Sequence, residues 1–532
     1  MSKHSIKKEK RKTEVLIIGS GALGSTFAHY LVRGGHQVTM LDAGPQLSAL
    51  PGEHLRNVPL YQRSPDGFGE VIASSLIPIS VPPDITEYTR ADPSSFNPYS
   101  TKAVVKQLPL EGQNPDQKAE TNLPDASSTY AVGGMVTHWT CSIPRPRGSQ
   151  LLTEIPQKEL STLYDKAERL LNLHTDAFTH SPLNNVVSNQ LSSNGFNVQP
   201  LPLAGARSPV NNYVYYTGAA DILGAPLLTG KLKKNLTILG DHLCTRLNWR
   251  KDGRERRIVS AEVIDFARNI KVIYSAKKFI VACNAILTPQ LLFNSDIWQD
   301  QLPALGRYLT EQPKFYGQVT LNESLVEKVA QLAPNPRYPK HDPIPFPASI
   351  DPPNLVIPPD PENGRIWHSQ IDRDPSNEGL LPPGSDQRLI VQLRWYAPTN
   401  PYRSNQLTFS SVNKDRFGMP QPTFHFKFRK DAIKAINMME PDFYRAAESL
   451  GGFFPGFEGR LQPPGNSLHY SGTTRIGHDP KTSVCDTYSK VWQFKNLYLG
   501  GNGMIPNGIA VNPTLTSVAI AIRAAERLAK EK

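Results

Sequence analysis

This chain of 532 residues has few cysteines and no long apolar run. Its four cysteines, Cys141, Cys244, Cys283 and Cys485, lie far apart and show no metal-ligand spacing. We therefore expect free thiols in a reducing compartment, with neither a disulfide framework nor a zinc or iron–sulfur site. No uninterrupted apolar stretch reaches the ~20 residues that a membrane-spanning helix needs, so the sequence excludes a transmembrane protein and predicts no membrane partner.

Negative charge is scarce at the start of the chain, where six basic side chains within the first twelve residues accompany Glu9 alone. The formal net charge of the whole chain is +11. A basic segment of this kind is compatible with nucleic-acid binding, but a solvated leader is the commoner explanation. We expect residues 1–12 to be disordered and predict no nucleic-acid partner. No apolar segment follows these charges, so the sequence predicts no secretory signal and an intracellular protein.

The residues after this basic segment predict a strand–helix–strand unit. Residues 14–18 and 38–41 are short apolar runs typical of buried parallel strands, and residues 25–32 have apolar positions at helical spacing. Dinucleotide-binding domains usually begin with such a unit.

The turn between the first strand and the helix reads Gly19-Ser20-Gly21-Ala22-Leu23-Gly24, which matches the dinucleotide fingerprint. Gly19 permits a tight turn, Gly21 lets a pyrophosphate approach the backbone, and Gly24 lets the helix pack on the strand. Asp42, at the end of the second strand, is placed to accept a ribose hydroxyl. The fingerprint predicts a dinucleotide site but does not distinguish FAD from NAD.

A second glycine-rich segment runs from Gly133 to Thr140. Its paired glycines allow a flat ligand to approach the backbone, and His138 stands within it, before Trp139. These residues alone leave His138 either a ligand contact or a structural histidine.

The C-terminal part of the chain contains a candidate base. His469 precedes a predicted last helix that begins at Pro513, with Asn512 as its cap. If His469 and Asn512 meet in space, they suit proton abstraction from an alcohol beside the positive end of a helix. A core histidine and a plain helix cap are the alternative interpretation.

From Glu14 to about Leu528 the chain resembles the glucose–methanol–choline flavin oxidoreductases and, within them, the pyranose oxidases. The fingerprint and the sequence Asn512-Pro513-Thr514-Leu515 are features of the broad family. The stretch 133–144 is more specific. Other similar stretches are residues 367–374, 419–424 and 469–477.

The resemblance implies FAD as the cofactor, attached covalently through His138. It places Thr140 beside the flavin N5, gives His469 the role of base and lets Asn512 share the substrate hydroxyl. On the sugar side it places Gln370, Asp374 and Arg394. Further cofactor contacts implied by the resemblance are Gly133, Gly134, Thr137, Trp139, Cys244, Asn502, Pro513 and Thr514.

The fold implied by the resemblance is mixed α/β: an FAD-binding Rossmann-like domain and a substrate domain built on a mostly antiparallel sheet. The segment from about residue 71 to residue 106 is similar to the arm through which the family tetramerises, so we expect a homotetramer. The expected FAD domain comprises residues 13–150, 230–312 and 485–532, and the substrate domain comprises residues 151–229 and 313–484, with a proline-rich surface segment at 334–361.

The resemblance implies oxidation of a pyranose hydroxyl at C2 to a ketone, with dioxygen reduced to hydrogen peroxide. The loop at residues 374–384 has no aromatic side chain, unlike the substrate loop of the family. A glycoside or a secondary-metabolite alcohol is therefore an alternative substrate, and a quinone is an alternative electron acceptor.

Overall fold

The computed structural model describes residues 8–57, 75–81, 113–210, 214–332, 353–372 and 389–531. The loop at 374–384, with Asp374, lies outside these residues. So do most of the expected assembly arm at 71–106 and most of the proline-rich segment at 334–361.

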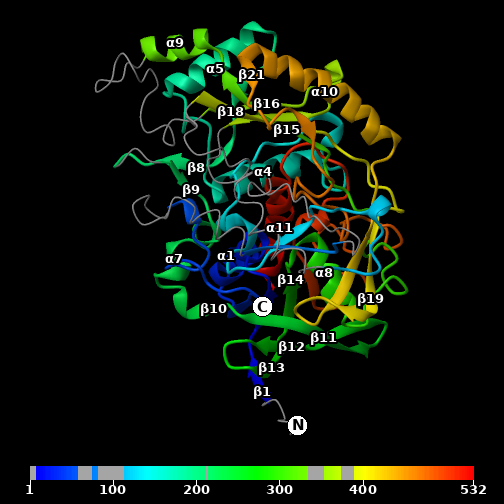
Figure 1. The fold of residues 1–532 in the computed structure, drawn as a ribbon. Helices are drawn as coiled ribbons and strands as arrows, with labels where there is room; N and C mark the ends of the chain where they lie inside the picture. The colour runs from blue at the N-terminus through cyan, green and yellow to red at the C-terminus, as the bar shows by residue number, and fades with distance from the viewer. Residues whose placement is uncertain are drawn as a thin grey trace.

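A five-stranded parallel sheet forms the centre of the molecule (Figure 1). Its order is β10 (Leu236–Leu239), β3 (Val38–Leu41), β2 (Val15–Ile18), β14 (Lys278–Val281) and β23 (Leu497–Leu499). The helices α1 (Ala22–Arg33) and α11 (Thr514–Leu528) pack against each other beside this sheet. The strand–helix–strand unit predicted at the start of the chain is therefore confirmed.

A second sheet, at the lower end of Figure 1, includes the start of the described chain. It comprises β1 (Lys8–Lys12), β13 (Ile270–Ser275), β12 (Glu255–Asp265) and β11 (His242–Asp252). The expectation of disorder is wrong for residues 8–12, which pair in parallel with β13. These residues are ordered because the backbone of the edge strand β13 can pair with them. Side chains add to the pairing: Glu9 forms ion pairs with Arg11 and Arg268, and Arg11 donates to the hydroxyl of Tyr274.

The third large sheet has seven strands, and all its pairings are antiparallel, as expected for the substrate domain. Its strands are β21 (Gly451–Phe453), β15 (Lys314–Leu321), β18 (Ile390–Tyr396), β17 (His368–Asp372), β16 (Asn354–Ile357), β7 (Gln199–Pro200) and β22 (Arg460–Leu461). One face packs on α5 (Pro182–Ser193), α9 (Glu323–Leu332) and α10 (Lys430–Leu450), at the top of Figure 1.

Side chains alternate between the two faces of this antiparallel sheet because the strand period is two residues. Phe315, Leu393 and Trp395 belong to the apolar core beneath the helices. The residues between them are buried but polar, with Lys314 and Arg394 among them. One face therefore serves stability, and the other presents polar groups to the interior of the protein.

Smaller elements complete the described chain. The helices are α4 (Gln157–Leu170), α6 (Ala219–Leu223), α7 (Ala225–Leu228) and α8 (Asn284–Phe293). The strands are β4 (Leu76–Pro78), β5 (Ser127–Thr129), β6 (Leu173–His174), β8 (Leu203–Arg207), β9 (Val214–Tyr216), β19 (Gln406–Lys414) and β20 (Pro420–His425). Within the described residues, no helix combines the length and the apolar character that crossing a membrane requires.

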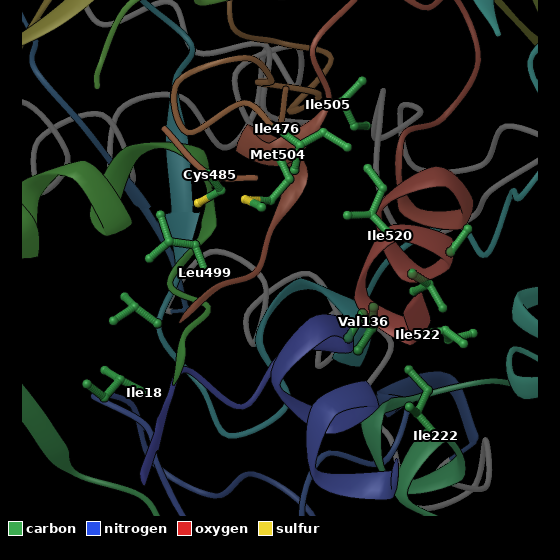
Figure 2. Close-up of a cluster of buried hydrophobic side chains, with 14 of the residues drawn as sticks. Ile18, Val136, Ile222, Ile476, Cys485, Leu499, Met504, Ile505, Ile520 and Ile522 are labelled. Carbon is green, nitrogen blue, oxygen red and sulfur yellow. The ribbon is translucent and has the colours of Figure 1, made fainter. Parts of the chain in front are cut away.

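The apolar core does not follow the domain boundary expected at residues 151–229. Leu163 of α4 and Ile222 of α6 belong to the core of the parallel sheet, and Figure 2 shows Ile222 beside Val136 and Ile522 in this core. The physical reason is α11, which is buried on almost every side and needs a cover on the side away from the sheet. α4 provides that cover, so much of 151–229 packs with the half of the molecule that contains the parallel sheet.

Candidate active site

A cavity runs from the turn between β2 and α1 to His469. Gly19, in that turn, has φ +97°, and a Cβ there would lie 2.4 Å from the carbonyl oxygen of Ala282. A Cβ on Gly24 would lie only 1.9 Å from the carbonyl oxygen of Gly19. Gly21 faces more open space, since its Cβ would be 3.7 Å from the nearest atom. The turn therefore brings bare backbone and the N-terminus of α1 to the cavity, an arrangement that suits a pyrophosphate.

Asp42 lines the same end of the cavity, where β3 ends. One carboxylate oxygen accepts hydrogen bonds from the backbone and the hydroxyl of Ser20, and the other accepts from the Gly44 amide at 3.0 Å. Burial raises the pKa of Asp42 to about 6, and these hydrogen bonds act in the opposite direction. Its position fits the expected contact with a ribose. Cys244, in the strand β11, lines this end as well.

The second glycine-rich segment lies directly against the turn at residues 19–24, called here the dinucleotide turn. Gly133 and Gly134 have φ values of +100° and +56°, and the Gly133 amide donates to the Ser20 hydroxyl at 2.8 Å. The chain then forms one 3₁₀ turn (Gly134–Thr137), after which His138 enters the cavity wall. The His138 ring is buried, with Nε2 3.0 Å from the hydroxyl oxygen of Thr129.

The residues on either side of His138 hold its segment in place or line the cavity. The Thr137 hydroxyl donates to the Gly134 carbonyl oxygen at 2.8 Å and closes the 3₁₀ turn. The Trp139 indole donates to the Thr217 carbonyl oxygen at 2.8 Å, which anchors the segment to the start of α6. Thr140 lines the cavity and is partly exposed to it.

His469 stands in the cavity wall between the segment at 133–140 and the antiparallel sheet. Its Nδ1 lies 2.8 Å from the side-chain carbonyl oxygen of Gln312, and its Nε2 lies 3.2 Å from the amide nitrogen of Asn512. Desolvation in this enclosed space, followed by the charge of Lys314, lowers the pKa of His469 to about 3. The imidazole is therefore neutral at ordinary pH and able to accept a proton.

The Asn512 side chain contacts three other polar side chains of the site and does not cap the last helix. The helix α11 begins at Thr514, its N-cap is Pro513, and no side chain caps it by a hydrogen bond. The side-chain oxygen of Asn512 instead accepts from the Ser142 hydroxyl at 2.8 Å and from the Gln370 amide at 2.6 Å. The expected cap is wrong because this buried amide is satisfied by tertiary contacts that the local sequence does not reveal.

The polar face of the antiparallel sheet forms the opposite wall. Lys314, Arg394 and Tyr396 line the cavity, and in the sheet register Lys314 lies opposite Tyr396 and Gln370 lies opposite Arg394. The Arg394 guanidinium donates to Asp372 at 3.0 Å, so its planar group is held in a fixed orientation. This wall combines cations with a phenol ring, which suits a substrate rich in hydroxyl groups.

Most of the expected site residues come together in this one cavity. The residues that line it are Gly19, Gly21, Asp42, Gly134, His138, Trp139, Thr140, Cys244, Arg394, His469, Asn502, Asn512 and Thr514. The residues that support it without lining it are Gly24, Gly133, Thr137, Gln370 and Pro513.

Several residues of the site were not expected from the sequence: Ser142, Gln312, Lys314, His368 and Tyr396. Tyr396 could have been found, because polar and apolar residues alternate along β18, the strand that it ends. Ser142 lies inside the family-like stretch at 133–144. Gln312 precedes a proline in a loop and gives no signal in the sequence.

Family profiles described as GMC oxidoreductase match residues 150–314 and residues 401–521. A profile described as ketopantoate reductase PanE/ApbA matches residues 15–57, which contain β2, α1 and β3. This last match is short and covers only the strand–helix–strand unit at the start of the chain.

Curated relatives extend the similarity over nearly the whole chain. A pyranose 2-oxidase from Lyophyllum shimeji is 35% identical, covering 97% of this chain and 91% of the relative. One from Tricholoma matsutake is also 35% identical, over 97% of this chain and 93% of the relative. A C-glycoside 3-oxidase from Arthrobacter globiformis is 30% identical, over 97% of this chain and 95% of the relative.

A solved structure shares the fold. Pyridoxine 4-oxidase from Mesorbium loti superposes with a TM-score of 0.59 at 16% identity, covering 98% of this chain and 100% of that one. The profile matches and the near-complete alignments show the family, and the fold of this solved oxidase agrees with them. The chain belongs to the glucose–methanol–choline family of oxidoreductases, whose membership implies FAD in the cavity described above.

Proposed function

We propose that this protein is an FAD-dependent oxidase that converts a ring hydroxyl of a pyranose, at C2 of a free sugar, to a ketone and reduces dioxygen to hydrogen peroxide. Each turnover removes two electrons and two protons from the sugar alcohol and adds both to dioxygen. The proposal rests on one observation: the His469–Asn512 pair lies in the same cavity as the dinucleotide turn and faces the polar sheet. The pyranose 2-oxidase relatives support it.

The residues of the chain have distinct tasks in this proposal. FAD, when bound, supplies the acceptor for the hydride and the route of the electrons to dioxygen or a quinone. His469 Nε2 takes the proton of the substrate hydroxyl, and the Asn512 amide donates to the oxygen on which negative charge develops. Arg394 holds other hydroxyl groups of the sugar, Gln370 orients Asn512 through its amide, and Thr140 lines the cavity.

We also propose that FAD is attached covalently through His138. Its buried position in the cavity wall, one 3₁₀ turn away from the paired glycines, supports the assignment. Gly21 and Gly134 lie within close reach of each other, since a Cβ on Gly134 would be 3.2 Å from the Gly21 Cα. Both leave room for a cofactor where a side chain would intrude.

A glycoside oxidised at C3 is the second candidate substrate. Two C-glycoside 3-oxidases, from Arthrobacter globiformis and Microbacterium trichothecenolyticum, are 30% and 29% identical to this chain over nearly its full length. The absence of aromatic side chains from residues 374–384 favours a site open to a bulky aglycone.

The test is anaerobic mixing of the holoprotein with glucose, xylose and a flavonoid C-glucoside, followed by loss of flavin absorbance. Carbon NMR of each product then locates the new carbonyl, and aerobic assays compare peroxide formation with reduction of benzoquinone. We expect a C2 ketone from glucose. A flavin that dithionite bleaches but no sugar or glycoside bleaches would contradict the proposal.

A homotetramer is part of the same proposal and rests on the similarity of residues 71–106 to the assembly arm of the family. Light scattering on the eluting protein should give four times the chain mass of 59.0 kDa. A monomer would remove this part and leave the chemistry untouched.

A further inference from the structure

The amide group of Gln312 has only one possible orientation. Its nitrogen donates to the carbonyl oxygens of Ile509 and Val511, at 2.7 and 2.9 Å, and all of these groups are buried. Turning the amide over would set its oxygen against two carbonyl oxygens. The Gln312 oxygen must therefore point away from them, toward His469 Nδ1 at 2.8 Å.

This orientation determines where the proton of the His469 ring resides. A carbonyl oxygen can only accept, so Nδ1 must carry the hydrogen. A neutral imidazole has a single N–H, which leaves Nε2 with a lone pair. The opposite tautomer would place two lone pairs against each other at 2.8 Å.

An independent contact on the other side of the ring gives the same answer. The side-chain oxygen of Asn512 already accepts from Ser142 and Gln370, so its nitrogen faces His469 Nε2 at 3.2 Å. An amide nitrogen can only donate, and Nε2 must therefore accept. Both contacts therefore favour one tautomer, and the Gln312 contact is the shorter, at 2.8 Å against 3.2 Å.

We propose that Gln312 is a positioning residue that holds His469 as the Nδ1–H tautomer, so that Nε2 is the atom that accepts the substrate proton. The identity of that substrate rests on the proposed function, whereas the tautomer is a property of the resting protein.

The choice of a neutral amide matters because of the charges around the ring. Three groups face His469. They are the Lys314 ammonium on β15, the Tyr396 ring on β18, with its centroid 5.6 Å from that of the His469 ring, and Glu311, a carboxyl oxygen of which accepts from the His469 backbone amide at 3.1 Å. Burial raises the pKa of Glu311 well above its ordinary value. His368 on β17 is also within electrostatic reach. A carboxylate in place of the amide would set one oxygen against the carbonyl oxygens of Ile509 and Val511, and its charge would favour the imidazolium, which cannot act as a base. An amide orders the ring without charging it.

The first arm of the test reads the tautomer without any substrate. Holoprotein labelled with ¹⁵N-histidine is compared by NMR with the His469→Ala variant, which identifies the two ring signals of His469. We expect a protonated Nδ1 and a bare Nε2 in the wild type. Gln312→Met should shift the ring toward the Nε2–H form, and Gln312→Glu should keep Nδ1–H. A wild-type ring protonated at Nε2, or a ring unchanged in Gln312→Met, would overturn the proposal.

The second arm measures anaerobic flavin reduction by sugar. Gln312→Met should slow it by about 10²- to 10⁴-fold, the range between loss of a general base and a wrong tautomer. Gln312→Glu should move the acid limb of the pH profile to higher pH, because its charge favours the imidazolium, and should retain activity above that limb. If the Met variant fails to fold, the ring signals of the wild type decide the question, since a wild-type ring protonated at Nε2 would overturn the proposal.

Gln117→Met is the matched control. The Gln117 amide is also buried and donates to backbone carbonyl oxygens, those of Lys118, Thr121 and Phe424, but it does not line the cavity. This variant should lose stability while the His469 signals and the reduction rate stay at their wild-type values. If no sugar reduces the wild-type flavin, the proposed function fails, and the NMR arm alone decides the role of Gln312.

Discussion

The two sheets that meet at the cavity are built from different sequence patterns. The parallel sheet uses short strands of mostly apolar residues, and the four residues of its central strand, Val15–Ile18, are all buried. The antiparallel sheet alternates, so that one face packs on α10 and the other carries Lys314, Gln370 and Arg394. The parallel sheet contributes to the cavity through the turns that follow its strands, whereas the antiparallel sheet contributes side chains from the strands themselves.

This difference suggests a division of labour that two readouts can separate. Changes at the turns of the parallel sheet should alter how much FAD the protein holds and how it is attached. Changes on the polar face of the antiparallel sheet should alter sugar turnover at full FAD content, and changes on its apolar face should alter stability alone.

The largest effect is expected for Gly24→Ala, in the turn of the parallel sheet. The added Cβ would lie 1.9 Å from the Gly19 carbonyl oxygen, so the dinucleotide turn cannot keep its shape. We expect purified protein with almost no flavin absorbance. Gly452→Ala in β21 of the other sheet is the control, because its Cβ would meet nothing within 4 Å. A Gly24→Ala protein that keeps its flavin absorbance would contradict the assignment of FAD binding to the turns of the parallel sheet.

His469→Ala should give the next largest effect, at full FAD content. Loss of a general base slows flavin reduction by sugar by about 10²- to 10⁴-fold, whereas reoxidation by dioxygen should change much less. Since the pKa of His469 is lowered to about 3, wild-type reduction should be independent of pH between about 5 and 8. Stopped-flow absorbance measures both half-reactions, and an unchanged reduction rate would mean that the base lies elsewhere.

The same difference decides what the sequence could predict. The β2–α1–β3 unit and its glycines are local in the chain, so the fingerprint located them correctly. The polar wall is not local, because Lys314, His368 and Tyr396 become neighbours only through the register of three strands. Residues 8–12 and Asn512 were misjudged for the same reason: a strand edge and a buried amide cluster offered tertiary partners that local rules omit.

The apolar face of the antiparallel sheet supplies a prediction about stability alone. One carboxylate oxygen of Asp442, on α10, accepts from the indoles of Trp367 and Trp395 and from Arg365. Burial raises the pKa of Asp442, but the Arg365 charge and these hydrogen bonds outweigh it, and the net effect lowers the pKa below its usual value. Asp442→Asn should cost about 1.5–3 kcal/mol of unfolding free energy at neutral pH, the range for hydrogen bonds to a charged group.

The pH dependence of this contribution has a definite sign. A lowered carboxyl pKa stabilises the fold above the unfolded value of about 3.9, and the contribution is lost as the pH falls through the folded value. The difference between wild type and Asp442→Asn in denaturant midpoint should therefore shrink in acid, with sugar turnover at neutral pH unaffected. Equal midpoints at neutral pH would show that Asp442 does not hold this face together.

The smallest effect on rate is expected for His138→Ala, although it tests the attachment of the cofactor most directly. Acid precipitation should leave the flavin in the wild-type pellet and release it to the supernatant in the variant. The folded variant should still bind FAD, because Asp42 and the turn at Gly19 and Gly21 do not depend on the His138 ring. A histidyl bond withdraws electron density from the flavin and eases hydride acceptance, so its loss should slow reduction by at most about tenfold, or ~1.4 kcal/mol on the barrier. Flavin already free in the wild-type supernatant would remove the covalent bond from the proposal, while a colourless His138→Ala protein would show that this segment, and not the turn alone, holds the cofactor.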